Sequence, residues 1–144
     1  MRDVIKKNFS DHLDVINKVL ESNIDSIDEF GDLLTTCLES DGTIFWCGNG
    51  GSASDSQHIS AELVGRFKKD RRALRSIALT TDTSILTSVG NDYGFEEIFS
   101  RQFSALGSAN DILVGISASG NSVNVINAFD FAKIAGIKTV AITA

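Results

Sequence analysis

Proline is absent from the 144 residues of this chain, and no run of apolar residues is longer than a few positions. Without proline, turns and helix ends must be made by Gly, Asn, Asp and Ser. The short apolar runs exclude a helix that spans a bilayer, so we expect no membrane partner. The first residues, Met1 to Asn8, lack the apolar core of a signal peptide, which favours a cytoplasmic protein.

Cysteines and basic residues are also scarce. Only Cys37 and Cys47 are present, and in a cytoplasmic chain we expect two buried thiols instead of a disulfide. Thirteen Lys and Arg against nineteen Asp and Glu give a net charge of −6. An acidic chain is a poor candidate for binding nucleic acid or an anionic membrane. The composition, 42% hydrophobic and 22% charged, is typical of a globular domain and excludes a disordered or low-complexity chain.

The pattern of apolar residues predicts a single domain over residues 1–144, with two parts. Residues 1–41 form two amphipathic helices, because apolar positions recur at helical spacing on both sides of a break at Ser22 and Asn23. Residues 42–144 alternate short apolar strands with helices. The strands are predicted at 43–47, 76–79, 111–116 and 138–142, and the helices at 52–64, 84–89, 95–106 and 122–135. This alternation predicts a parallel α/β sheet between helical layers, a doubly wound, flavodoxin-like three-layer sandwich.

The last predicted strand, 138–142, looks buried although no helix follows it in this sequence. A parallel strand needs cover on both faces. We therefore expect either that other elements cover this strand or that the chain is a shortened version of a longer protein.

A glycine-rich loop, Gly48–Ser52, follows the first predicted strand. Ligands bind at the carboxyl ends of strands in open α/β sheets, and the free N–H groups of the next helix suit an anion or a sugar hydroxyl. Ser52 is predicted as the N-cap of that helix, with Asp55 three residues further on. A dinucleotide-binding loop and a plain structural turn are the alternatives. A phosphate loop of the Gly-Lys-Ser/Thr type is excluded, because no such triplet is present.

A second polar loop, Ser117–Ser122, follows the third predicted strand and opens the next helix. Its hydroxyl and N–H groups suit a phosphate monoester held without Lys or Arg. The alternative is a capped turn in which Ser119 or Ser122 only satisfies helix N–H groups. Together the two loops predict a pocket with a sugar end and a phosphate end.

Two ionisable residues, His58 and Glu62, share one face of the first crossover helix because they are four residues apart. We expect both to reach a ligand held by the glycine loop. A carboxylate there could remove the proton next to a carbonyl, the step that interconverts ketoses and aldoses. The pair is also half of a zinc site, or a solvated contact on the helix surface. No third ligand is evident in this chain.

Two further segments carry candidate residues. A basic run, from Arg66 to Arg75, is predicted to be a solvated loop, although Arg66 lies close enough to the crossover helix to meet a ligand or a neighbouring subunit. Asn91 and Asp92 are predicted in a turn, where Asp92 orients sugar hydroxyls or starts the next helix.

Taken in order, four motifs resemble the phosphoheptose isomerase family of sugar isomerase (SIS) domain enzymes: Cys47–Ser52, His58–Phe67, Val89–Phe95 and Gly115–Ser122. The resemblance implies conversion of sedoheptulose 7-phosphate to D-glycero-D-manno-heptose 7-phosphate, which leads to ADP-heptose and the lipopolysaccharide core. It also implies a homotetramer in which the N-terminal helices pack between subunits.

The resemblance assigns roles to individual residues. Glu62 would be the catalytic base, and His58 and Glu62 would bind zinc. The substrate would be bound by Asn49, Gly50, Gly51, Ser52, Glu62, Arg66, Asn91, Asp92, Ser117, Ala118, Ser119 and Ser122. The family commonly has threonine where this chain has Ala118, which removes one hydroxyl contact.

Family members continue past the last strand to a Gln and a His that complete the zinc site, and neither follows the strand 138–142 in this sequence. The resemblance therefore implies a chain that binds the phosphosugar but turns it over poorly. The rival hypothesis is a binding protein of the same fold, such as the SIS-domain protein that associates with the bacterial replication initiator. Glu62 favours the enzyme.

Overall fold

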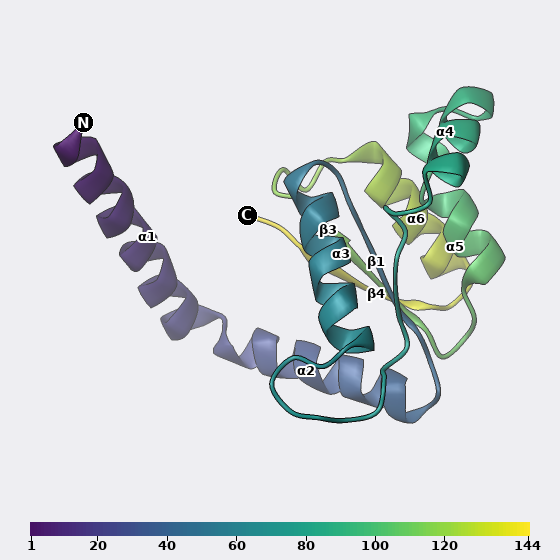
Figure 1. Cartoon of the computed structure of the whole chain (residues 1–144), viewed down its shortest axis with the longest axis horizontal. Helices are drawn as coiled ribbons and strands as arrows, with labels where there is room; N and C mark the ends of the chain where they lie inside the picture. The colour runs from purple at the N-terminus through teal and green to yellow at the C-terminus, as the bar shows by residue number, and fades with distance from the viewer. The chain divides into compact units, whose positions relative to one another are not determined.

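The computed structural model describes all 144 residues and divides them into two compact units, Met1–Leu33 and Leu34–Ala144. All the predicted strands and helices are present, but the helix predicted over 95–106 is split into a 3-10 turn and a short α-helix. The elements, labelled in Figure 1, are α1 (Arg2–Ser22), α2 (Ile24–Glu39), β1 (Ile44–Gly48), α3 (Gly51–Val64), β2 (Ser76–Ala78), α4 (Thr83–Asp92), η1 (Phe95–Glu97), α5 (Ser100–Leu106), β3 (Ile112–Ile116), α6 (Val123–Ile134) and β4 (Lys138–Ile142).

The first unit is helical, and its helix break is where the sequence predicts it. α1 ends at Ser22 and α2 begins at Ile24, with Asn23 between them. α1 buries none of its residues, and apolar side chains such as Val4, Phe9 and Leu13 are exposed along it. No helix in the structure is long and apolar enough to cross a lipid bilayer.

The second unit contains a four-stranded parallel sheet in the order β2-β1-β3-β4. α3 packs on β1 and β2, whereas α6 packs on β3 and β4 and also contacts α5. Figure 1 shows α3 on one side of the strands and α5 and α6 on the other. The three-layer α/β architecture is therefore confirmed. The reversal of strand order falls between β1 and β3, which connect onward in opposite directions.

Side chains of β1 alternate between the two faces of the sheet. Phe45 and Cys47 join the apolar core on the side of α5 and α6, where the ring of Phe45 meets that of Phe103 edge to face at 5.2 Å. Trp46 lies on the other face, where its indole N–H donates to Ser76 Oγ (2.9 Å). Ser76 Oγ in turn donates to Ser60 Oγ on α3 (3.1 Å), so a buried polar chain fixes α3 against β1 and β2.

The prediction of a buried final strand is wrong. β4 pairs only with β3 and forms an edge of the sheet, and four of its five residues are exposed. The physical reason is its place at the edge, because apolar alternation alone does not say which strands have neighbours on both sides.

Candidate functional site

The two polar loops predicted to bind a ligand lie at the reversal of strand order. The glycine loop follows β1 and the serine loop follows β3, and these two strands are neighbours in the sheet. In open α/β sheets the crevice at such a reversal is the usual place for a ligand, because the flanking loops separate there. The structure therefore brings together the two loops that are 65 or more residues apart in the sequence.

The glycine loop places bare backbone at this crevice. Gly50 has a φ of 57° and a ψ of −119°, a conformation that residues with a side chain rarely adopt. A Cβ on Gly48 would come within 2.8 Å of the Ile116 carbonyl oxygen, so glycine permits the close approach of β1 and β3. α3 begins at Gly51 with Gly50 as its N-cap, and no side chain caps it. The prediction that Ser52 is the N-cap is wrong, because the helix starts one residue before it.

The serine loop is held by one hydroxyl pair. Ser117 and Ser122 hydrogen-bond to each other through their Oγ atoms at 2.9 Å, and Ser117 is buried. Ser122 is the N-cap of α6, yet its side chain makes no capping hydrogen bond. Ser119 Oγ accepts from the backbone N–H of Asn121 within the turn (3.2 Å). Neither serine therefore satisfies a helix N–H group: Ser119 accepts from a residue that precedes α6, and the hydroxyl of Ser122 pairs with Ser117. Ala118 lies exposed between them.

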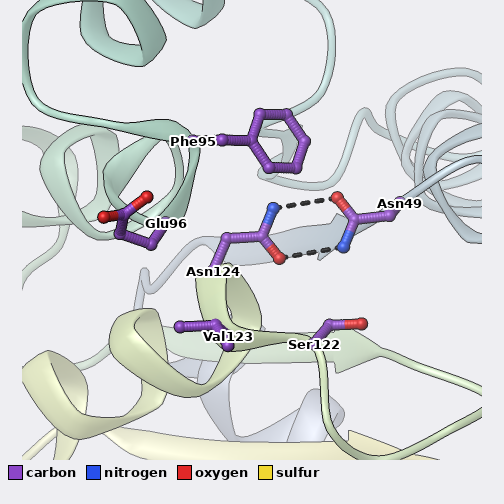
Figure 2. A pocket seen from close by; sticks show the side chains of 6 residues that line it. All are labelled: Asn49, Phe95, Glu96, Ser122, Val123 and Asn124. Atoms are coloured by element: carbon purple, nitrogen blue, oxygen red, sulfur yellow. Dashed lines mark hydrogen bonds between the residues drawn. The ribbon is translucent and has the colours of Figure 1, made fainter.

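A cavity of about 540 Å³ joins the two loops. Asn49 lines it from the glycine loop and Ser122 from the serine loop, as Figure 2 shows. The remaining lining residues are Phe95, Glu96, Val123 and Asn124. A smaller cavity of about 180 Å³ shares Asn49 and Phe95 with it, and one of about 140 Å³ shares Ser122. The space thus continues along both loops, in a size range that suits a small ligand.

Four of these lining residues, Phe95, Glu96, Val123 and Asn124, were not identified from the sequence. Phe95 and Glu96 belong to η1, and only the tertiary fold brings this segment to the cavity. Asn124 follows Ser122 by two residues. Its position on the first turn of a helix that follows a ligand loop could have identified it from the sequence. Its amide pairs with that of Asn49 by two hydrogen bonds, of 2.8 and 2.9 Å.

His58 and Glu62 share a face of α3, as predicted, with 3.9 Å between His58 Nε2 and Glu62 Oε1. Neither residue lines the cavity or its two smaller neighbours. The reason is the helix itself: Glu62 lies eleven residues after Gly51, which is about 16 Å along the axis. The expectation that both side chains reach a ligand on the glycine loop of the same chain is therefore not supported.

The residues present do not form a complete zinc site. No group of three or more His, Cys, Asp and Glu side chains is placed to hold a metal ion. Zinc sites in proteins use three or four protein ligands, and His58 and Glu62 supply two. His58 is also largely exposed, with 76% of its side chain accessible, so nothing in this chain encloses an ion there.

The other candidates lie outside the cavity. Asn91 and Asp92 are the last residues of α4 and are exposed, with Asn91 Nδ2 donating to Asp92 Oδ1 (2.7 Å). The predicted turn at these positions is wrong, because α4 runs three residues further than the apolar pattern indicates. Arg66 is exposed just beyond the end of α3. Neither cavity nor hydrogen bond connects these three residues to the two loops.

The basic run is not uniformly solvated. Arg71 is half-buried and donates to the carbonyl oxygens of Glu62 and Leu63, both over 2.9 Å. Arg71 therefore supplies hydrogen-bond donors to the last carbonyl groups of α3. The prediction of a solvated loop is wrong for this residue, because sequence spacing does not show which arginine meets the helix end.

Comparison with known proteins agrees with this architecture. Residues 8–144 match the family model described as the SIS domain. The chain is 51% identical over 140 residues to a phosphoheptose isomerase of Helicobacter pylori strain P12, covering 97% of this chain and 73% of that one. It is 49% identical over 143 residues to the phosphoheptose isomerase of Aliarcobacter butzleri, covering 99% and 76%.

Two solved structures are also similar. The phosphoheptose isomerase of Neisseria gonorrhoeae superposes with a TM-score of 0.92 at 42% identity, covering 99% of this chain and 74% of that one. The enzyme of Francisella tularensis gives 0.94 at 35% identity, covering 98% and 74%. The chain belongs to the phosphoheptose isomerase family of SIS-domain proteins. The family resemblance carried by the four sequence motifs is thereby confirmed.

Proposed function

We propose that this chain is a phosphoheptose isomerase that converts sedoheptulose 7-phosphate to D-glycero-D-manno-heptose 7-phosphate. The observation that carries the proposal is the single cavity that Asn49 and Ser122 line together. One of its loops offers an amide and bare backbone for sugar hydroxyls, and the other offers hydroxyls at the start of α6 for a phosphate. The similarity to named phosphoheptose isomerases over nearly the whole chain supports this substrate and favours the isomerase over the initiator-associating protein.

The proposed contacts follow from these loops. Asn49, Gly50, Gly51 and Ser52 bind the sugar, and Ser117, Ala118, Ser119 and Ser122 bind the phosphate, with Ala118 contributing backbone only. Asn91, Asp92 and Arg66 complete the substrate contacts in the family-based assignment.

The proposed reaction is a proton transfer through an enediol. The Glu62 carboxylate takes a proton from C1 of the ketose, the electrons of that C–H bond form the C1–C2 double bond, and the ketone oxygen on C2 takes up a proton from solvent to become a hydroxyl. Glu62, which exchanges its proton with solvent, then delivers a proton to C2, while the O1 hydroxyl gives its proton to solvent and the aldehyde forms at C1. No atom is gained or lost, so the step needs no oxidant or reductant.

Glu62 lies about 16 Å along α3 from the glycine loop, which bears on where this transfer occurs. In a homotetramer, Glu62 of one subunit would act at the cavity of another subunit, so its separation from the glycine loop of its own chain would not prevent the transfer. The exposed apolar side chains of α1 supply a surface for such an assembly. Mixing a Glu62→Gln chain with a Ser122→Ala chain then tests the arrangement: mixed oligomers contain sites with both residues unaltered, so activity at low substrate concentration should rise above that of either variant alone.

Zinc has a limited place in the proposal. His58 and Glu62 are the family-based ligands, but two side chains do not make a site, and no part of the proton transfer depends on the ion. The pathway implied by the substrate, ADP-heptose synthesis for the lipopolysaccharide core, places the enzyme in the cytoplasm.

The test is direct. The purified chain is incubated with sedoheptulose 7-phosphate in D2O, and the sugar is followed by NMR. We expect appearance of the aldose anomeric signals together with deuterium at C2 of the product. Sugar phosphate that binds without any exchange at C1 would contradict the enzyme and leave a binding protein.

A further inference from the structure

Asn124 is a buried polar residue that lines the cavity. It is the second residue of α6, and only 3% of it is exposed. Its side chain points from α6 toward Asn49 on the glycine loop, as Figure 2 shows. None of the residues proposed above to bind the substrate includes it, so its role needs an explanation of its own.

The two amides form a closed pair. Asn49 Nδ2 donates to Asn124 Oδ1 over 2.8 Å, and Asn124 Nδ2 donates back to Asn49 Oδ1 over 2.9 Å. Each amide group has two N–H donors and two lone pairs on its oxygen. The pair uses one donor and one lone pair on each residue. Asn49 therefore keeps one N–H and one lone pair, and it is the member of the pair that is half-exposed at the cavity.

Within this pair, Asn124 is the more firmly held residue. Asn124 stands on a helix whose next residue, Val125, belongs to the core, and Ala128 one turn later does too. Asn49 stands in a loop and is followed by Gly50, which has no side chain to hold it. A buried amide left without partners is costly, so Asn124 strongly favours the paired state. The anchored residue orients the loop residue, and not the reverse.

We infer that Asn124 is a positioning residue for the substrate: it holds the Asn49 amide so that the remaining N–H and lone pair of Asn49 meet hydroxyl groups of the sugar. In a closed amide pair these two groups point away from each other, so the N–H donates to one sugar hydroxyl and the lone pair accepts from another. The same bridge ties the start of α6, next to the phosphate end, to the glycine loop at the sugar end. This inference rests on the proposed function, because it concerns the same cavity.

The test is a double-mutant cycle on binding. Calorimetry measures the affinity for sedoheptulose 7-phosphate in the unaltered chain, Asn49→Ala, Asn124→Ala and the double variant. We expect each single variant to bind ~10-fold more weakly, the effect of losing about one good hydrogen bond. Because Asn124 acts through Asn49, adding Asn124→Ala to Asn49→Ala should change the affinity less than about 2-fold.

A matched control is Asn110→Ala, which removes an exposed asparagine that donates to the Ser40 carbonyl at the other end of β3. It should bind the sugar as the unaltered chain does. If Asn124→Ala fails to fold, the unaltered chain provides the measurement: the side-chain amide signals of both Asn49 and Asn124 should shift in 15N NMR spectra when the sugar phosphate is added.

The outcomes are distinct. Three results would each overturn the inference and leave the proposed function intact. They are losses of affinity that multiply in the double variant, normal sugar binding by Asn124→Ala, and an Asn49 amide signal that does not shift when the sugar phosphate is added. Failure of the unaltered chain to bind sedoheptulose 7-phosphate would overturn the proposed function and this inference with it.

Discussion

The guanidinium group of Arg71 donates from Nη2 to the main-chain carbonyl oxygen of Glu62 over 2.9 Å. Its Nη1 donates to the carbonyls of Leu63 (2.9 Å) and Gly65 (3.4 Å). The last carbonyls of a helix have no partner within it, and a positive charge at that end is favourable. Arg71 therefore fixes the end of α3 that carries the proposed catalytic base.

Replacing Arg71 should loosen that helix end. Arg71→Lys keeps the charge but loses the fork that reaches several carbonyls at once, and we expect a loss of about 1–2 kcal/mol in the free energy of unfolding. Urea denaturation measures it. Arg72→Lys is the control, because Arg72 is exposed and adjacent. Equal effects at both positions would mean that the carbonyl contacts of Arg71 contribute nothing.

Glu62→Gln should separate binding from chemistry. The amide keeps the shape of the side chain but cannot accept a proton from C1, so we expect kcat to fall by ~10³-fold, with the affinity for sedoheptulose 7-phosphate little changed. Coupled product detection and calorimetry give the two quantities. Glu39→Gln at the end of α2 serves as a control for the loss of one charge. Retained isomerase activity in Glu62→Gln would remove this residue from the mechanism.

Adjacent glycines in the first loop should respond differently to alanine. Gly50 has a positive φ, and a Cβ there meets no atom within 4 Å, so Gly50→Ala should cost about 1–3 kcal/mol from backbone strain alone. Gly51 is the first helical residue and also has open space around it. Gly51→Ala should be neutral or stabilising by up to ~1 kcal/mol. Thermal unfolding compares them, and the same sign in both would contradict the conformational explanation.

Ser122→Ala tests whether the serine loop binds phosphate or has only a structural role at the start of α6. The Ser122 side chain makes no capping bond, so α6 should not weaken, and the cost of about 1 kcal/mol comes from Ser117, which loses its partner. We expect a ~10-fold weaker affinity for the sugar phosphate. Ser104→Ala on α5, an exposed serine bonded to the Arg101 carbonyl, is the matched control. Unchanged affinity in Ser122→Ala would favour the structural reading of the loop.

Cys47 gives a pH dependence of stability. Burial raises the pKa of its thiol to about 12, whereas an unfolded chain titrates near ~8.5. Below pH ~8.5 both states keep the proton and the thiol has no effect. Between these values only the unfolded state loses it, so stability should fall by about 1.4 kcal/mol per pH unit from this group.

Comparison with Cys47→Ala isolates that contribution from other groups that titrate at high pH. Urea unfolding at several values between pH 8.5 and 10 should give a shallower decline in the variant than in the unaltered chain. The same burial predicts that Cys47 reacts with thiol reagents only after unfolding, as does Cys37, whose pKa burial also raises. Identical pH slopes in the two chains would show that Cys47 ionises as easily in the folded state as in the unfolded one.

The sequence by itself determined the elements of this protein and their order. Strands such as 112–116 are short and apolar, helices follow the 3.6-residue repeat, and the Gly and Ser clusters at 48–52 and 117–122 mark the loops between them. These are local properties, set by the conformational preferences of neighbouring residues. Alternation of strand and helix was enough to predict the parallel sheet and to place both loops at its carboxyl edge.

Only the tertiary structure decided which of these features meet. Asn49 and Asn124 are 75 residues apart and pair because β1 and β3 are neighbours in the sheet. Arg71 closes α3, β4 forms an edge, and Glu62 lies far along α3 from the cavity on its own chain. Hydrogen bonds and burial between distant segments depend on strand order and on side-chain geometry, and no pattern within a short window of sequence carries that information.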